Sequence, residues 1–322
     1  MMSTAILNFA KQFEYKPTVE NKQHLKKKKR IIVLGMGGSH LGADVIATLK
    51  PEVPLTIHSD YGLPALSKQD LKESLIIASS YSGNTEEVID GMQLALKQKL
   101  SVAVISVGGN MLEIAKQKKL PYVELPNTGI QPRSALGFSV IGLLALMGET
   151  TVLKEVQQLA KILAPKKWES KGKQLAKKLV DRVPVIYSSK ANMAVAYNWK
   201  IKLNETGKIP AFYNVVPELN HNEMTGFDVT TSSEHLSKQF VFLFLENKAD
   251  NAKNQQRMQV LKKLYKKRGL AVESIPLTGT TKAQKIFQSL LWADWTAVSI
   301  AAHYGLESEQ VPMVEEFKRL IK

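Results

Sequence analysis

The chain has 322 residues, more than a single hydrophobic core usually supports, so we expect two domains. Apolar residues make up 44% of the chain, which excludes a mostly disordered protein. The absence of cysteine excludes disulfides, thiolate nucleophiles and cysteine-based zinc sites, and it is compatible with a reducing cytosol. A net charge of +15 leaves nucleic acid, anionic membranes and small anionic substrates open as partners.

The basic residues are spread through predicted helices, and only Lys26–Arg30 forms a block, directly before a predicted strand. No basic segment is interleaved with aromatic residues and no helix-turn-helix extension is evident, so we expect no nucleic-acid partner. The most apolar stretch, Leu136–Met147, is too short to cross a bilayer, and Met1–Ala10 lacks the pattern of a secretory signal. We therefore expect a cytoplasmic protein without a membrane partner, whose charge is mostly solvated and partly draws anions toward the site.

The first half of the chain alternates short apolar runs with amphipathic segments. Strands are expected at residues 31–34, 55–58, 75–78, 102–106 and 122–125, and helices at 41–49 and 86–98. Strands that alternate with helices form a parallel sheet covered on both faces, and right-handed crossovers place the strand-to-helix turns on one edge.

The second half starts this pattern again after a lysine-rich helical connection at residues 151–180. Strands are expected at 185–187, 240–245 and 272–277, and helices at 194–206, 252–267 and 282–303. The tracts 75–108 and 240–277 share one strand–helix–strand layout, which indicates an internal duplication. We therefore predict an α/β protein of two tandem doubly wound lobes with parallel sheets, the first at residues 1–150 and the second at 151–322.

A glycine-rich turn, Gly35–Ser39, follows the first strand. Such turns bind phosphate because bare backbone N–H groups can approach it and a helix begins there. The dinucleotide fingerprint needs a third glycine where this chain has His40, and no Gly-Lys-Ser/Thr follows, so neither nucleotide motif is present. On this turn alone, a phosphate site and a purely structural turn stay equally open.

The segment Ser80–Glu87 follows the third strand and combines small hydroxyl side chains, a glycine and two acids. One interpretation is an N-cap in which Asn84 or Thr85 satisfies the first N–H groups of the helix. Glu86 and Glu87 would then favour the helix dipole. Capping needs one hydroxyl, and three within six residues therefore favour phosphate binding.

These motifs carry a resemblance. Ser80–Glu87 resembles the phosphosugar loop of the sugar isomerase (SIS) domain, and Gly35–Ser39 resembles the turn that precedes it. The chain then matches further motifs of the bifunctional phosphoglucose/phosphomannose isomerase family, in their order and approximate spacing, at Pro132–Gly137, Asn204–Lys208, Glu218–Glu223 and Lys318. The resemblance covers nearly the whole chain, and the combination is specific although each motif alone is not.

The resemblance implies two tandem SIS-type lobes and an isomerase that acts on a sugar 6-phosphate without metal or nucleotide cofactor. Glucose 6-phosphate, with mannose 6-phosphate as a second candidate, would interconvert with fructose 6-phosphate through a cis-enediol. The residues implied in phosphate binding are Gly38, Ser39, Ser80, Ser82 and Thr85.

The same resemblance implies four catalytic residues. Glu205 would move the proton between C2 and C1, and Arg133 would stabilise the charge on the enediol oxygens. His221 and Lys318 would open the sugar ring and move protons between its oxygens. In this family the histidine comes from the partner subunit, which implies a homodimer with a shared active site.

Each catalytic assignment has a structural alternative. Glu205 can pair with Lys202 or Lys208 at a helix end, His221 can be an ordinary loop histidine, and Arg133 can cap a carbonyl. No second histidine or carboxylate stands at metal-ligand spacing near His221, so we expect no metal site.

The C-terminal segment leaves two points open. Arg319 and Lys322 flank Lys318, and a solvated lysine is therefore the alternative there. Glucose-specific relatives carry a glutamine seven residues before the C-terminal lysine, where the bifunctional enzymes carry threonine. This chain has Val311 at that place, with Gln310 adjacent, so the use of mannose 6-phosphate stays open.

Two other functions fit part of the pattern. The first is a different SIS-domain isomerase. The glutamine-dependent amino-sugar enzyme needs an N-terminal cysteine, and this chain has no cysteine. Arabinose 5-phosphate isomerases usually carry a nucleotide-binding tail after one lobe, which is not seen here. The second is a non-catalytic phosphosugar-binding regulator, which pairs one lobe with a DNA-binding segment. The joint presence of Glu205 and His221 favours catalysis.

Overall fold

The computed structural model describes residues 2–321, and Met1 and Lys322 lie outside the described residues. The chain divides into two compact units. The N-terminal unit comprises residues 8–163, and the C-terminal unit comprises residues 2–7 and 164–321. Residues 151–163, which the sequence suggested for the second lobe, belong to the N-terminal unit.

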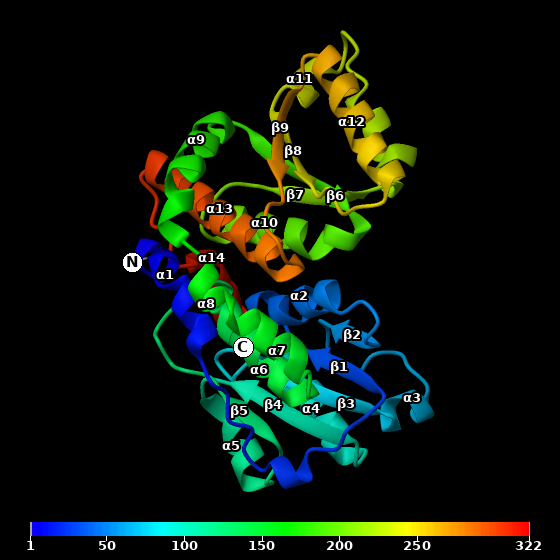
Figure 1. Ribbon diagram of the computed structural model, residues 1–322, viewed down its shortest axis with the longest axis vertical. Helices are drawn as coiled ribbons and strands as arrows, with labels where there is room; N and C mark the ends of the chain where they lie inside the picture. The colour runs from blue at the N-terminus through cyan, green and yellow to red at the C-terminus, as the bar shows by residue number, and fades with distance from the viewer. Residues whose placement is uncertain (1, 322) are drawn as a thin grey trace. The chain divides into compact units, whose positions relative to one another are not determined.

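The N-terminal unit contains a five-stranded parallel sheet with the strand order β2-β1-β3-β4-β5 (Figure 1). Its strands are β1 (Arg30–Leu34), β2 (Leu55–His58), β3 (Ser74–Ser79), β4 (Ser101–Ser106) and β5 (Tyr122–Glu124). Its α-helices are α2 (Leu41–Leu49), α3 (Lys68–Lys72), α4 (Glu86–Lys97), α5 (Gly109–Gln117), α6 (Leu136–Met147), α7 (Thr150–Gln157) and α8 (Leu159–Ile162). Short 3₁₀ helices are η1 (Phe9–Glu14), η2 (Lys22–His24), η3 (Gly37–Ser39) and η4 (Pro132–Ser134).

Helices cover both faces of this sheet, as the alternation of strands and helices predicts. Val88 and Met92 of α4 and Met111 of α5 pack on Ile32 and Ile76 of the central strands, and all five side chains are buried. On the other face, α6 contacts β4, β5 and α2 (Figure 1). Residues 136–147 are therefore the buried helix α6, which explains why they form the most apolar stretch of the chain.

The C-terminal unit contains a four-stranded parallel sheet with the order β7-β6-β8-β9. Its strands are β6 (Val183–Ser189), β7 (Phe212–Val216), β8 (Phe240–Glu246) and β9 (Ala271–Pro276). Its α-helices are α1 (Met2–Leu7), α9 (Glu169–Leu179), α10 (Met193–Glu205), α11 (Glu234–Ser237), α12 (Ala252–Lys267), α13 (Lys282–His303) and α14 (Pro312–Leu320). The 3₁₀ helices are η5 (Pro165–Trp168), η6 (Lys190–Asn192), η7 (Glu218–His221) and η8 (Glu223–Phe227).

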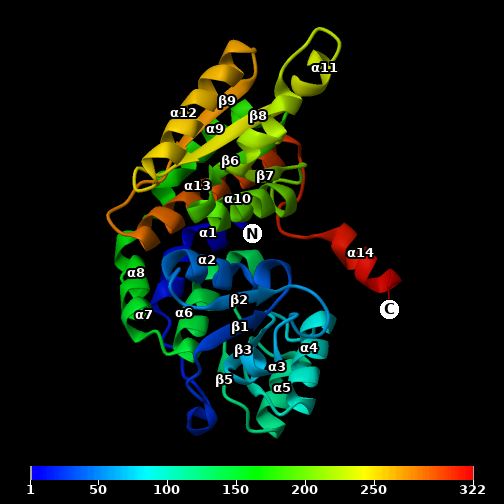
Figure 2. The same ribbon diagram turned by 90° about the vertical axis from the view of Figure 1, so that its right-hand side faces the viewer.

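Figure 2 shows α12 on one face of this sheet and α10 and α13 on the other. Met258, Leu261 and Tyr265 of α12 pack on Phe242 and Phe244 of β8. The β8–α12–β9 unit repeats the arrangement of β3–α4–β4 in the first sheet, with neighbouring parallel strands joined by a helix. The structure thus confirms two α/β lobes with parallel sheets.

The helical connection at residues 151–180 is broken rather than continuous. α7 and α8 end before Leu163, whose backbone is extended (φ −73°, ψ 134°), and Pro165 starts the 3₁₀ turn that leads into α9. The helical region is disfavoured for the residue directly before a proline, and Ala164, directly before Pro165, is non-helical (φ −125°, ψ 80°). Proline itself favours the first position of a new helix. The break coincides with the division between the two units.

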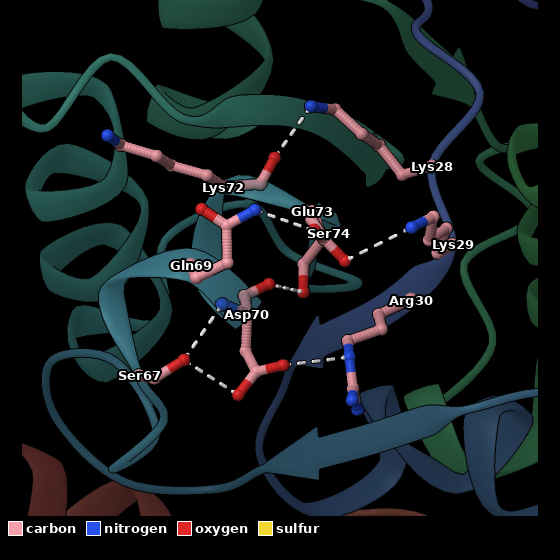
Figure 3. Close-up of polar contacts among 9 residues, drawn as sticks. All are labelled: Lys28, Lys29, Arg30, Ser67, Gln69, Asp70, Lys72, Glu73 and Ser74. Carbon is pink, nitrogen blue, oxygen red and sulfur yellow. Dashed lines mark hydrogen bonds and ion pairs between the residues drawn. The ribbon is translucent and has the colours of Figure 1, made fainter.

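Three residues of the basic block, Lys28–Arg30, contact α3 and the turn after it at the amino end of β1 (Figure 3). Arg30 Nε lies 3.1 Å from an Asp70 carboxylate oxygen, and Lys28 donates from Nζ to the Lys72 carbonyl over 2.6 Å. The strand-to-helix loops leave from the opposite, carboxyl edge of a parallel sheet. This block therefore lies at the edge of the sheet remote from those loops.

Candidate active site

Two loops of the N-terminal unit leave neighbouring strands at the carboxyl edge of the sheet. The chain continues from β1 to β2 on one side and from β3 to β4 on the other, and open α/β sheets bind ligands at such switch points. The Ser79 hydroxyl donates to the Ser39 carbonyl over 2.7 Å, and the Tyr81 backbone N–H donates to the Ser39 hydroxyl over 2.9 Å. The predicted residues Ser39 and Ser80 therefore stand on two adjoining loops.

The second of these loops gathers hydroxyl groups around one turn. Ser80 Oγ lies 2.7 Å from Thr85 Oγ1 and accepts a hydrogen bond from the Gly83 N–H at 3.1 Å. Ser82 is exposed, and its hydroxyl accepts from the Asn84 N–H at 3.3 Å. A hydroxyl that accepts a hydrogen bond retains its own proton for donation. One proton of the Ser80–Thr85 pair is used between the two hydroxyls, so the pair retains one proton for donation and Ser82 retains its own. The loop presents these donors at the start of α4, where a helix N-terminus favours an anion.

The alternative interpretation of this loop as an N-cap is wrong for α4. Thr85 occupies the N-cap position but makes no side-chain cap hydrogen bond. Asn84 Oδ1 accepts instead from the backbone N–H of Asn110 at 3.0 Å, so this side chain caps the first turn of α5. Capping of α4 therefore does not explain the hydroxyls of this loop.

Glycines allow three chain segments to meet here. Gly83 has a left-handed φ of +72°, and a Cβ at this position would lie 1.8 Å from the Gly108 carbonyl oxygen. A Cβ on Gly38 would lie 2.9 Å from the backbone nitrogen of Arg133. The η3 turn therefore packs directly against η4, and Arg133, which is only 2% exposed, lies in this neighbourhood.

The predicted base Glu205 is the last residue of α10 and is partly exposed. The Asn204 side chain donates to the Ile209 carbonyl over 3.0 Å, and Lys208 donates from Nζ to the Glu205 carbonyl over 2.7 Å. Lys202 Nζ lies 2.6 Å from a carboxylate oxygen of Asp294. The first lysine proposed as a structural partner of Glu205 thus pairs with Asp294, and the second binds the main chain of Glu205.

The loop that carries His221 is attached to the sheet by Glu223. Tyr187 of β6 donates to one oxygen of this carboxylate over 2.5 Å, and the Asn214 side chain donates to the other. Burial and the nearby Tyr265 and Glu223 raise the pKa of Tyr187, so its phenol remains a proton donor to the carboxylate. His221 itself is exposed at the end of η7. A buried anchor therefore holds a loop that presents the histidine to solvent.

Lys318 lies on α14, a helix with no buried residue. Its ammonium lies 2.9 Å from a Glu315 carboxylate oxygen, and the two side chains are 58% and 60% exposed. An exposed pair at this spacing contributes little to stability. The structure therefore places Lys318 on an exposed helix face.

The predicted site residues fall into two groups. The N-terminal unit brings together the carboxyl-edge loops and η4, with Gly38, Ser39, Ser80, Ser82, Thr85 and Arg133. Glu205, His221 and Lys318 belong to the C-terminal unit. The sequence offered Lys208 only as a possible partner of the Glu205 side chain, and it indicated no role for Glu223, although both residues stand inside the motifs that suggested the site.

Within residues 2–321, the His, Cys, Asp and Glu side chains form no group of three or more that could hold a metal ion. None of the helices in this range has both the length and the apolar character needed to cross a membrane.

Comparison with known proteins identifies relatives along the whole chain. Residues 168–321 match the family model of the bacterial phospho-glucose isomerase C-terminal SIS domain. The bifunctional phosphoglucose/phosphomannose isomerase of Caldicellulosiruptor bescii is 31% identical over 306 residues, which cover 90% of this chain and 88% of that protein. The protein of the same name from Aquifex aeolicus is 30% identical over 98% of this chain and 96% of its own length.

The fold has relatives among solved structures. The crystal structure of glucosamine-6-phosphate deaminase from Thermotoga maritima is similar with a TM-score of 0.71 and 14% sequence identity, covering 97% of both chains. At this identity the similarity concerns the fold alone. It agrees with the two parallel-sheet lobes described above.

Proposed function

The chain belongs to the family of bifunctional phosphoglucose/phosphomannose isomerases, and we propose that the residues of its loop motifs bind a sugar phosphate and carry out its isomerisation. The protein is an aldose–ketose isomerase that interconverts glucose 6-phosphate with fructose 6-phosphate, and the proposal includes mannose 6-phosphate as a second aldose. Similarity to two relatives of this name along nearly the whole chain is the observation that carries this function.

The phosphate of the substrate binds in the N-terminal unit. The hydroxyls of Ser39, Ser80, Ser82 and Thr85 and the backbone of Gly38 are the proposed ligands. Support comes from the junction of the two loops through Ser39 and from the position of Thr85 at the start of α4. Backbone N–H groups at a helix start suit a phosphate dianion, and the hydroxyls add neutral donors that need no counter-ion.

The proton transfer uses Glu205 as base. In the open-chain aldose, its carboxylate takes the proton from C2 while O1 accepts a proton, which yields the cis-enediol. Loss of the O2 proton and return of the carbon-bound proton to C1 then gives the ketose, so the proton count is unchanged. Arg133 stabilises the negative charge that develops on the enediol oxygens, and His221 and Lys318 move protons at the ring oxygen and at O1 and O2.

The active form is a homodimer in which His221 serves the site of the partner subunit. The protein works in the cytoplasm. The exposure of His221 at the end of η7 supports the shared site of the homodimer, because an exposed histidine on an anchored loop is accessible to a second chain. The absence of cysteine agrees with a reducing compartment.

The experiment is a coupled assay that follows conversion of fructose 6-phosphate to glucose 6-phosphate, with mannose 6-phosphate formation measured in parallel. We expect turnover of fructose 6-phosphate that persists in excess EDTA, with Glu205→Gln as the inactive control. Activity that disappears in EDTA and returns with a divalent ion would instead indicate metal-dependent transfer. A protein that binds sugar phosphates without any turnover would be a phosphosugar-binding regulator.

A further inference from the structure

Lys208 connects two parts of the C-terminal unit that are far apart in the sequence. Its ammonium donates to the carbonyl oxygen of Glu205 over 2.7 Å and also to the carbonyl oxygen of Gln310. Glu205 is the proposed base at the end of α10, whereas Gln310 lies two residues before α14. One side chain therefore bridges the backbone of the base-bearing helix and the segment that leads to Lys318.

The backbone around Lys208 is shaped for this bridge. Lys208 has a left-handed φ of +58°, which costs energy for a residue with a side chain. Gly207 permits the sharp turn, because a Cβ at that position would lie 2.7 Å from the Leu203 carbonyl oxygen. The turn directs the chain back toward α10, and Asn204 fixes it from the other side through the Ile209 carbonyl.

The segment at the other end of the bridge is also ordered. The Glu307 carboxylate accepts from the backbone N–H of Glu309 at 2.8 Å and from that of Gln310 at 2.5 Å. The Gln310 peptide thus has its N–H held by Glu307 and its carbonyl held by Lys208. Its orientation is fixed on both sides.

The helix that follows has few attachments of its own. No residue of α14 is buried, and the ion pair of Lys318 is with Glu315 of the same helix. Figure 2 shows α14 standing apart from the sheet and helices of the C-terminal unit. The position of α14 relative to α10 therefore depends strongly on the segment 306–311, where the Lys208 bridge acts.

We propose that Lys208 is a positioning residue, which couples the base Glu205 to the segment that carries Val311 and Lys318. This inference rests on the proposed function for its kinetic consequence. Lys208 holds the last turn of α10 and the Gln310 peptide at fixed positions relative to each other. Glu205 and Lys318 can then act on the C2 proton and on the substrate oxygens in the same bound geometry. A displacement of about 1 Å in such a site can reduce the rate on the order of 100-fold.

A lysine suits this task because its ammonium carries three donors and can serve two carbonyl oxygens at once. Lys208→Met keeps the length of the side chain but removes every donor, and Lys208→Arg keeps the charge and several donors. Lys28→Met is the matched control, since Lys28 also donates from Nζ to a backbone carbonyl, that of Lys72, in the N-terminal unit.

The kinetic test measures kcat and KM of these variants with fructose 6-phosphate, and the ratio of glucose 6-phosphate to mannose 6-phosphate formed. We expect Lys208→Met to lower kcat about 10- to 100-fold while KM changes less than about threefold, and the product ratio to shift. Lys208→Arg and Lys28→Met should retain most of the activity. A loss of kcat no greater than in Lys28→Met, or an unchanged product ratio, would overturn the coupling.

The structural test is hydrogen exchange of the segment 306–321, which needs no substrate. In Lys208→Met the Gln310 region should exchange faster, whereas the β6 and β8 core should keep its protection. Lys208→Gln, whose amide is shorter, serves as a second variant if Lys208→Met folds poorly, and it should show the same local change. Unchanged exchange around Gln310 in a folded variant refutes the bridge, whether or not the protein proves to be an isomerase.

Discussion

The hydroxyl oxygens of Ser80 and Thr85 lie 2.7 Å apart across the turn between β3 and α4. Ser80 is 1% exposed and also accepts a hydrogen bond from the Gly83 N–H, whereas Ser82, two residues later, is exposed. One serine of the loop therefore supports its shape, and the other is available to a ligand at little structural cost. This difference allows shape and binding to be separated by mutation.

Ser82→Ala should raise KM for fructose 6-phosphate more than it lowers kcat, because the phosphate does not react. Loss of one hydrogen bond to a charged group costs roughly 1.5–3 kcal/mol, which corresponds to about 10- to 150-fold in KM. Ser80→Ala should raise KM as well, but it should also lower the free energy of unfolding. Steady-state kinetics and urea titration measure the two effects. An unchanged KM in Ser82→Ala would mean that the phosphate binds elsewhere.

Gly83→Ala should destabilise the N-terminal unit. The left-handed φ of +72° strains any alanine, and its Cβ would also overlap the Gly108 carbonyl oxygen. Gly129→Ala is the control, because Gly129 has nearly the same φ of +70° and no atom within 4 Å of its Cβ position. We expect about 1 kcal/mol from the strain alone in the control and at least about 2 kcal/mol more in Gly83→Ala, measured by urea unfolding. Equal losses would show that the loop adapts to the side chain.

Lys202→Met should destabilise the C-terminal unit by about 3–5 kcal/mol, because it removes the buried ammonium that pairs with the Asp294 carboxylate. The two side chains are only 3% and 11% exposed. Lys238→Met, which removes an ion pair that is 63% and 44% exposed, should change stability by less than about 1 kcal/mol. Adding Asp294→Leu to Lys202→Met should recover most of the loss. A small effect of Lys202→Met in urea titration would contradict the buried-pair argument.

The strands could be predicted largely from their apolar runs. The run at 55–58 coincides with β2, and most other predicted strands end within one or two residues of the observed ones. β7 (Phe212–Val216) was missed, because it is an edge strand with mostly part-exposed side chains and an asparagine in its centre. Apolar periodicity is weak in such a strand, and its pairing with β6 comes from tertiary structure.

The candidate site could be predicted only as a set of motifs. The hydroxyl-rich loop after β3 indicated phosphate binding because its composition exceeds what one helix cap needs. The bridge from Lys208 to Gln310 spans 102 positions, and local sequence patterns carry no information on such a contact. Likewise, the Lys202–Asp294 pair joins α10 and α13, so the sequence offered Lys202 only as a local partner for Glu205.

The assignment of Glu205 and His221 to different chains of one site predicts complementation. Glu205→Gln keeps the shape of the side chain and removes proton abstraction, so kcat should fall at least on the order of 10²- to 10⁴-fold. Binding of a stable sugar phosphate should survive, because the proposed phosphate ligands lie in the N-terminal unit. His221→Ala should reduce turnover of ring-closed substrates more than that of an open-chain analogue.

Mixing the two inactive variants under conditions of subunit exchange should restore activity. A mixed dimer holds one site with both native residues only if Glu205 and His221 come from different chains, and random exchange makes half of all dimers mixed. In each mixed dimer one of the two sites is then active. Full exchange therefore predicts about one quarter of the wild-type activity per subunit. Subunit exchange is verified independently with two affinity tags. Verified exchange without recovered activity would refute the shared site but leave Glu205 as the base, whereas normal turnover by Glu205→Gln alone would refute the proton-transfer mechanism itself.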